Sequence, residues 1–239
     1  MKKINLLFDT DESVYFIRLG TFDVLEKIQS GSVWFRTLKY YREKYEDTTI
    51  STIGDKYEGV NFLAHPEKCD SIKISFPSVN NGESHEIKNQ LIGPVTAVQN
   101  DDYFISCYSY FNFQNMENKT IIHNNYLLEN DWDHVLIFFD FYNYITSIRG
   151  TVSPNPVYRG IVKYLDFKDN QDSIDVFNKS DTFKWQKEYR IAISKNYLSS
   201  DKITKIDEDT IEIKCGDVNS VIVPRSEINT YCKGKRKFA

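Results

Sequence analysis

The stretch that decides the fold runs from Val14 to Arg36 and reads VYFIRLGTFDVLEKIQSGSVWFR. The residues at its beginning alternate as they do in a strand, and the residues at its end have a strand pattern again. A short helix is therefore predicted between two strands. Thr21 suits the N-cap of that helix, and Gly31 suits the position just after it. The apolar face of the helix would consist of Phe22, Leu25 and Ile28.

The rest of the chain predicts mainly strands that follow one another without regular crossover helices. The fold class expected is therefore α+β, with predominantly antiparallel pairing. Strands are expected at Val95–Gln99, Tyr103–Tyr110, Val135–Phe139, Tyr158–Leu165, Phe183–Ile193, Thr210–Lys214 and Ser220–Val223. Helices are expected at Leu38–Tyr45, Asn124–Asn130 and Phe141–Arg149.

The stretches Ile72–Phe76 and His85–Lys88 flank a segment that contains Asn-Asn-Gly, which favours a β-hairpin. A length of 239 residues suits one large domain. We therefore expect a single domain over 1–239, with a possible hairpin insertion near 66–94. The polar stretch Glu46–Gly59 is expected to be a surface loop.

Charge and cysteine usage narrow the class of protein. The net charge of −4 gives no global basic surface for nucleic acid. The apolar run Ile4–Phe8 is too short for a signal peptide or a membrane span, so an intracellular, cytoplasmic protein without a membrane partner is expected. The cysteines lie far apart, which suggests neither a disulfide framework nor a zinc site. The histidines show no metal-ligand spacing, and no metal is expected.

The late predicted strand carries Gln186 and Glu188 on one face, together with Arg190. If that face lines a cleft, Glu188 could stabilise positive charge on a ribose as nicotinamide leaves, or accept a proton from a nucleophile. Gln186 would reach the same cleft. The alternative is an exposed sheet face on which Glu188 and Arg190 pair with neighbouring charges.

Two earlier strands offer partners for such a cleft. Arg18 could bind a pyrophosphate or a ribose through its planar guanidinium, or simply pair with Asp23 or Glu26. Ser106 and Tyr108 share a strand face that could hold a ribose hydroxyl and stack a nicotinamide ring. The alternative for Tyr108 is ordinary core packing.

These segments together resemble the ADP-ribosyltransferase superfamily: a strand with Arg18, a helix ending in Ile-Gln-Ser-Gly, a middle strand with serine, and a late Gln-Lys-Glu. The resemblance is to its arginine-serine-glutamate branch and to toxins that modify DNA. The chain also resembles uncharacterised bacterial and phage proteins that share a Gly-Asp-x-x-Glu-Gly loop, here Gly54–Gly59, and a Trp-Gln-x-Glu-Tyr-Arg strand. No clean Ser-Thr-Ser triplet is present.

The superfamily resemblance implies a twisted or split β-sandwich that binds NAD, with Arg18 on the dinucleotide, Ser106 supporting it and Glu188 catalytic. The activity implied is ADP-ribosyl transfer or NAD glycohydrolysis by an intracellular toxin or phage-defence effector. The acceptor could be nucleic acid or protein, and an antitoxin or a phage protein could be a partner. We expect Asp55 and Glu58 to contact the acceptor from their loop.

Two other functions remain open at this point. Glu212 and Lys214 lie on one face of a predicted strand, with the spacing that a magnesium-dependent nuclease uses near a phosphate. A module that binds a nucleotide or a protein without turnover is the third possibility.

Overall fold

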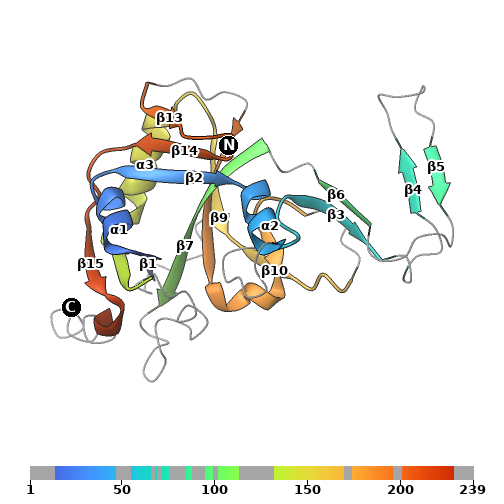
Figure 1. Cartoon of the computed structure of the whole chain (residues 1–239), viewed down its shortest axis with the longest axis horizontal. Coiled ribbons are helices and arrows are strands. Elements are labelled where there is room, and N and C mark those ends of the chain that lie inside the picture. The colour runs from blue at the N-terminus through green and yellow to red at the C-terminus, as the bar shows by residue number, and fades with distance from the viewer. Residues whose placement is uncertain are drawn as a thin grey trace.

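The computed structural model describes residues 14–46, 55–65, 68, 72–75, 84–87, 95–98, 102–112, 132–169, 174–195 and 201–228. Within these residues the fold is α+β with mostly antiparallel strands, as predicted. A nine-stranded sheet forms the body of the molecule (Figure 1). Smaller two-stranded sheets join β10 to β11, β3 to β6 and β4 to β5.

The bounds of the strands are as follows: β1 Val14–Gly20, β2 Ser32–Thr37, β3 Val60–Ala64, β4 Ile72–Ser75, β5 Ser84–Ile87, β6 Val95–Val98, β7 Tyr103–Asn112, β8 His134–Phe138, β9 Val157–Ile161, β10 Lys163–Leu165, β11 Asn178–Ser180, β12 Glu188–Ser194, β13 Ile203–Lys205, β14 Thr210–Lys214 and β15 Ser220–Pro224. The helices are α1 Phe22–Gln29, α2 Leu38–Glu46 and α3 Phe141–Val152. The hairpin prediction is confirmed, because β4 and β5 pair antiparallel. The predicted helix at Asn124–Asn130 lies outside the described residues.

The opening strand, helix and strand form as predicted. Thr21 is the N-cap residue of α1, and Gly31 follows the helix with a φ of +87°. A positive φ is a conformation that glycine adopts without a Cβ penalty, so the chain can turn there into β2. Leu25 and Ile28 point into the core, as the spacing indicated, whereas Phe22, predicted on the same face, is 44% exposed.

Strand β7 is the centre of the sheet, because it pairs with three other strands, β1, β2 and β12. On one edge β12 covers residues 103–109 without interruption. On the other edge β2 pairs with residues 104 and 105, whereas β1 pairs with residues 109–112. The two strands leave Ser106, Cys107 and Tyr108 unpaired between them on that edge. The sheet therefore divides at the middle of β7.

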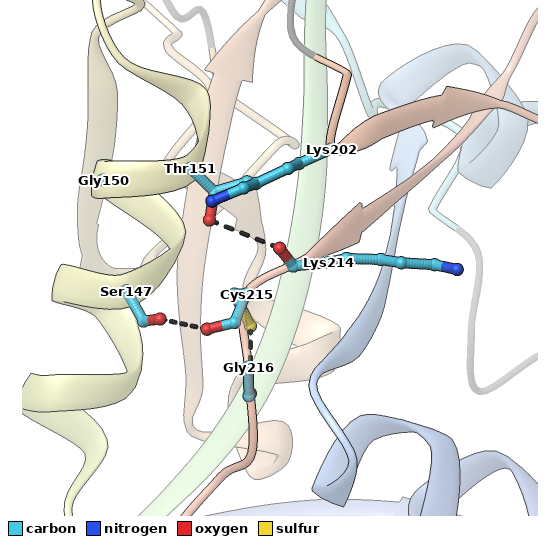
Figure 2. A pocket seen from close by; sticks show the side chains of 7 residues that line it. All are labelled: Ser147, Gly150, Thr151, Lys202, Lys214, Cys215 and Gly216. Carbon is cyan, nitrogen blue, oxygen red and sulfur yellow. Dashed lines mark hydrogen bonds between the residues drawn. The ribbon is translucent and has the colours of Figure 1, made fainter.

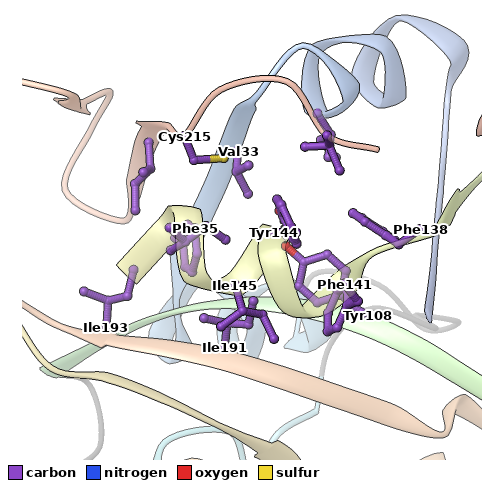
Figure 3. Packing of buried hydrophobic residues seen from close by; sticks show 14 of the residues in the cluster. Val33, Phe35, Tyr108, Phe138, Phe141, Tyr144, Ile145, Ile191, Ile193 and Cys215 are labelled. Carbon is purple, nitrogen blue, oxygen red and sulfur yellow. Dashed lines mark hydrogen bonds between the residues drawn. The ribbon is translucent and has the colours of Figure 1, made fainter. Parts of the chain in front are cut away.

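Helices α1 and α3 cover one face of the sheet (Figure 3). Asp140 caps α3 by accepting a hydrogen bond from the Asn143 backbone N–H at 3.0 Å. The buried residues of α3 recur at helical spacing: Phe141, Tyr144, Ile145, Ile148 and Val152. Each such buried side chain stabilises the fold by about 1.5 to 3 kcal/mol. The core on this face is continuous with the side chains of β2, β12 and β14.

The opposite face of the sheet carries the elements that build the candidate site. Leu38 of α2 packs there on Ile105 of β7 and Ala192 of β12. Cys107 lies partly buried in the same cluster. The residues that face this side of β12 before Ala192 are Glu188 and Arg190, which are both buried.

Candidate functional site

Arg18 lies where the sheet divides. It belongs to β1, and its guanidinium donates a hydrogen bond to the backbone oxygen of Cys107, which neither β1 nor β2 pairs. Its Cζ lies 5.5 Å from the centre of the Tyr108 ring. Burial lowers the pKa of Arg18, but Tyr41, Tyr108 and Cys107 raise it by more. Arg18 therefore stays charged and closes the gap in the sheet.

Ser106 and Tyr108 share a face of β7, as predicted, and that face lies under α3. The Ser106 hydroxyl donates to the Tyr108 hydroxyl at 3.0 Å, and the latter lies 2.6 Å from the hydroxyl of Tyr144. The Tyr108 ring packs edge-on against Phe138 and Phe141. Tyr108 is thus part of the packed core, with its polar end satisfied by a short chain of hydroxyls.

A group of buried charged side chains lies on the other face of the sheet. We call it the charged cluster; it consists of Asp55, Glu58, Lys179, Glu188 and Arg190, each at most 4% exposed. Arg190 binds Glu58 through two nitrogens, at 2.5 and 3.0 Å, and its Nε donates to Glu188 at 2.5 Å. The Lys179 Nζ lies 3.1 Å from Glu188 and 3.6 Å from Glu58. The cluster joins three parts of the chain that are far apart in sequence.

The prediction of a continuous strand from Phe183 to Ile193 is wrong in its first part. Residues Asp181–Gln186 form a 3-10 helix, Lys187 has a φ of +44°, and β12 begins only at Glu188. Gln186 and Glu188 therefore do not meet through strand alternation. They meet because Lys179 binds both, donating to the Gln186 side-chain oxygen at 2.8 Å.

The prediction of a surface loop is also wrong for Asp55, Glu58 and Gly59, which are buried, whereas Lys56 in the same turn is exposed. Asp55 and Glu58 are both 2% exposed. Asp55 accepts hydrogen bonds from the backbone N–H groups of Tyr57 and Ser180, each at 3.0 Å. These side chains hold the turn against β11 and β12 and are turned away from solvent. Contact between them and an acceptor molecule is untested and has no support from this placement.

Opposing effects set the pKa values of the two glutamates in the cluster. Burial raises the pKa of Glu188, but Arg190 and Lys179 outweigh it and hold that pKa well below its usual range. Burial also raises the pKa of Glu58, and Asp55 and Glu188 add to the increase, against Arg190 and Lys179. The cluster holds three carboxylates and two cations. Asp55 is among the groups that raise the pKa of Glu58, whereas Glu188 accepts hydrogen bonds from Arg190 and Cys107 that lower its pKa.

The low pKa of Glu188 predicts acid sensitivity. A carboxyl whose pKa is lower in the folded state stabilises the fold above its ordinary pKa, and that contribution is lost as pH falls. Between about pH 6 and pH 3, the free energy of unfolding of the wild type should therefore decline more steeply than that of Glu188→Gln. Urea unfolding at stepped pH measures both slopes. Parallel slopes would contradict a depressed pKa at Glu188.

Arg18 and Glu188, which are 170 positions apart, reach the same short piece of β7. Ser109 pairs with Ile17 on one edge of β7 and with Glu188 on the other. Cys107, whose carbonyl binds Arg18, pairs with Arg190. The structure thus brings the predicted dinucleotide-binding arginine and the predicted catalytic glutamate to opposite edges of one strand.

Tyr41 and Lys179 are parts of this region that the sequence did not indicate. Burial and Cys107 raise the pKa of Tyr41, whereas Arg18 lowers it, so the Tyr41 hydroxyl lies within the electrostatic reach of the gap in the sheet. Lys179 belongs to β11, a strand of three polar residues with no hydrophobic pattern. No motif around either residue distinguishes it from an ordinary surface side chain.

A separate surface depression of 520 Å³ lies between α3 and the end of β14 (Figure 2). Its lining residues are Ser147, Gly150, Thr151, Lys202, Lys214, Cys215 and Gly216. The hydroxyl of Ser147 donates to the Cys215 carbonyl, which ties the helix to the strand end. None of the predicted NAD-site residues lines this depression.

Glu212 and Lys214 are the pair of residues suggested for a magnesium-dependent nuclease. Glu212 accepts a hydrogen bond from the Ser32 hydroxyl of the neighbouring strand. In Figure 2 the Lys214 side chain points away from the other labelled residues. Across the described ranges, no group of three or more His, Cys, Asp or Glu side chains is arranged to hold a metal ion.

Comparison of the chain with protein-family models, with curated proteins and with solved structures gives no match. Among the helices that the structure describes, none is both long and apolar enough to span a membrane.

Proposed function

We propose that this protein cleaves the bond between nicotinamide and ribose in NAD and passes ADP-ribose to water or to an acceptor. The observation that supports the proposal is that Arg18 binds the Cys107 carbonyl from one edge of β7, while Glu188 pairs with Ser109, two residues further along, on the other edge. An anion-binding guanidinium, here on β1, and an ionised carboxylate, here on β12, are the two groups that such a reaction needs.

The chemistry assigns each group one task. Arg18 would bind the diphosphate of NAD through its planar donors. As the C1′–N bond breaks, its electron pair leaves with nicotinamide, and the carboxylate of Glu188 would stabilise the positive charge on the ribose. The oxygen of water or of the acceptor then bonds to C1′ and loses its proton to solvent. A carboxylate with a depressed pKa remains anionic for this task throughout the neutral range.

Access to Glu188 sets a condition on the proposal. Its side chain is buried and its oxygens accept hydrogen bonds from Lys179 and Arg190. The residues that cover it must therefore part before a ribose can reach it. The same burial fits a structural role for Glu188, and with that role the second candidate function is binding of a nucleotide without turnover.

The biological setting that we propose is a cytoplasmic toxin or phage-defence effector, with nucleic acid or protein as the acceptor. An antitoxin or a phage protein would be its partner. These proposals rest on the resemblance to ADP-ribosyltransferases, and they depend on NAD cleavage being observed.

Release of nicotinamide from NAD by the purified protein is the direct test. Glu188→Gln should lower the rate about 100-fold or more, because it removes the charge and keeps the shape. Absence of nicotinamide release, together with measurable NAD binding by calorimetry, would favour the second candidate. Absence of both release and binding would contradict the proposed function.

Arg18→Met should raise the KM for NAD about tenfold or more, since one to two charge-assisted hydrogen bonds to the diphosphate are lost. Arg18→Lys keeps the charge but not the fork and should recover part of the loss. Arg149→Met, on the exposed side of α3, is the matched control and should leave KM unchanged. Equal KM values for Arg18→Met and Arg149→Met would remove Arg18 from the site.

A further inference from the structure

The ammonium group of Lys179 makes more polar contacts within the protein than that of an exposed surface lysine does. Its ammonium donates to the side-chain oxygen of Gln186 at 2.8 Å and to Glu188 at 3.1 Å, and it lies 3.6 Å from Glu58. The ring of Phe183 lies 4.8 Å away on a further side. Two of the three ammonium protons are therefore donated in hydrogen bonds, to Gln186 and Glu188, and the positive charge is also balanced by Glu58.

The surrounding strands hold Lys179 in this position. β11 pairs in parallel with β10, and Lys179 lies opposite Tyr164. The Tyr164 hydroxyl accepts a hydrogen bond from the backbone N–H of Glu188 at 2.9 Å. Next to Lys179, the Ser180 N–H is bound by Asp55. The two-stranded sheet thus presents Tyr164 and Lys179 together to the first residue of β12.

The turn before β12 explains why such a support is needed. Lys187 adopts a positive φ, and the 3-10 helix ends immediately before it, so strand pairing does not fix the Gln186 side chain. Glu188 is the first residue of β12, and its pair with Ser109 is the first pair between β12 and β7. Lys179 is thus a side-chain link between the turn and the first residue of β12, in addition to the hydrogen bond that Arg190 donates to Glu188.

From this geometry we infer that Lys179 is a positioning residue, which fixes Gln186 and Glu188 beside each other and thereby sets the activity of Glu188. The inference rests on the proposed function for its kinetic consequence. Lys179 donates to both Gln186 and Glu188, so the role that we assign to it is exerted through these two side chains. Its effect is exerted through the orientation and ionisation of Glu188, because an adjacent cation favours the charged form of a carboxylate.

Three variants test this role. Lys179→Met removes the charge at similar length, Lys179→Arg keeps the charge, and Lys163→Met removes an exposed lysine from the adjacent strand β10. For each variant, kcat and KM for nicotinamide release are measured per folded molecule across a pH series. The titration of the Glu188 carboxyl is followed by carbon-13 NMR in the same proteins, without NAD.

The expected result is a kcat at least tenfold lower in Lys179→Met, with KM little changed and the acidic limb of the pH profile moved to higher pH. Lys179→Arg should recover most of the kcat, and Lys163→Met should behave as the wild type. A Lys179→Met protein with the kcat and pH profile of the wild type would overturn the inference.

If the wild type releases no nicotinamide, the proposed function fails. The NMR titration then still tests whether Lys179 sets the ionisation of Glu188. Glu188 should then still titrate at higher pH in Lys179→Met than in the wild type. An unchanged titration would overturn the inference. If Lys179→Met does not fold, the wild type and Lys179→Arg are compared. The inference is then overturned if the Glu188 carboxyl of the wild type titrates in its ordinary range.

Discussion

Arg190→Met should lower the free energy of unfolding by about 3 to 5 kcal/mol, the usual cost of removing one partner from a buried ion pair. Arg190 is 1% exposed and holds Glu58 and Glu188 at once, while also donating to the Val176 carbonyl at 2.7 Å. Methionine fills much of the volume but leaves two carboxylates buried beside Asp55 with Lys179 as their one cation in the charged cluster.

Glu188→Gln provides the internal comparison, because it removes the excess negative charge of the cluster. Glu58 and Asp55 then balance Lys179 and Arg190, and the loss should be limited to about 1.5 to 3 kcal/mol from weakened charged hydrogen bonds. Arg159→Met, on the exposed face of β9, should change stability by less than about 0.5 kcal/mol. Urea unfolding of the three variants checks the order. A larger loss in Glu188→Gln than in Arg190→Met would contradict the charge count.

Gly31→Ala should be the most disruptive small substitution at a described glycine. The φ of Gly31 is +87°, and a Cβ there would lie 2.2 Å from the backbone oxygen of Gly216. The left-handed conformation costs about 1 to 3 kcal/mol, and the shift of backbone against backbone adds about 1 to 3 kcal/mol. The same residue accepts the Cys215 backbone N–H at 2.9 Å, so the shift also strains the joint between α1 and β14.

Two other glycines separate the contributions. Gly216 has a φ of +82° but nothing within 4 Å of its Cβ position, so Gly216→Ala should show the conformational cost alone, about 1 to 2 kcal/mol. Gly150 lies in α3 with open space around it, and Gly150→Ala should stabilise the protein by about 0.5 to 1 kcal/mol. Thermal or urea unfolding measures all three. Equal losses at Gly31 and Gly216 would show that the backbone contact yields without cost.

Local signals were sufficient for much of the fold. Thr21 and Gly31 marked the ends of α1 because capping and a positive φ are properties of those residue types. The bounds of β14 were predicted to the residue, since the apolar residues Ile211 and Ile213 alternate with polar ones over Thr210–Lys214. Arg18 and Glu188 could be paired in advance only through the resemblance to a family. Their meeting at β7 depends on strand order, which no local pattern contains.

The errors arose where distant partners override local preference. Asp55 and Glu58 have the composition of an exposed loop, and their burial depends on Arg190, which lies 132 positions after Glu58. The alternation from Phe183 to Gln186 fits a strand as well as it fits a 3-10 helix. Lys187, which separates this helix from β12, adopts the left-handed conformation. It is neither glycine nor asparagine, the residue types that would have indicated that conformation in the sequence. Lys179 was not found because its role exists only when three segments come together.

The central position of β7 has a consequence for the synthesis of the chain. Along one edge of this strand, residues 103–109 of its ten residues are covered by residues 188–194. At roughly 5 to 20 residues per second, the ribosome needs about 4 to 16 seconds to make the intervening segment. During that time β7, which contains no charged residue, has an open edge of the kind that pairs with other chains. The arrival of β12 ends this exposure, so the segment that carries Glu188 and Arg190 also protects the nascent chain from aggregation.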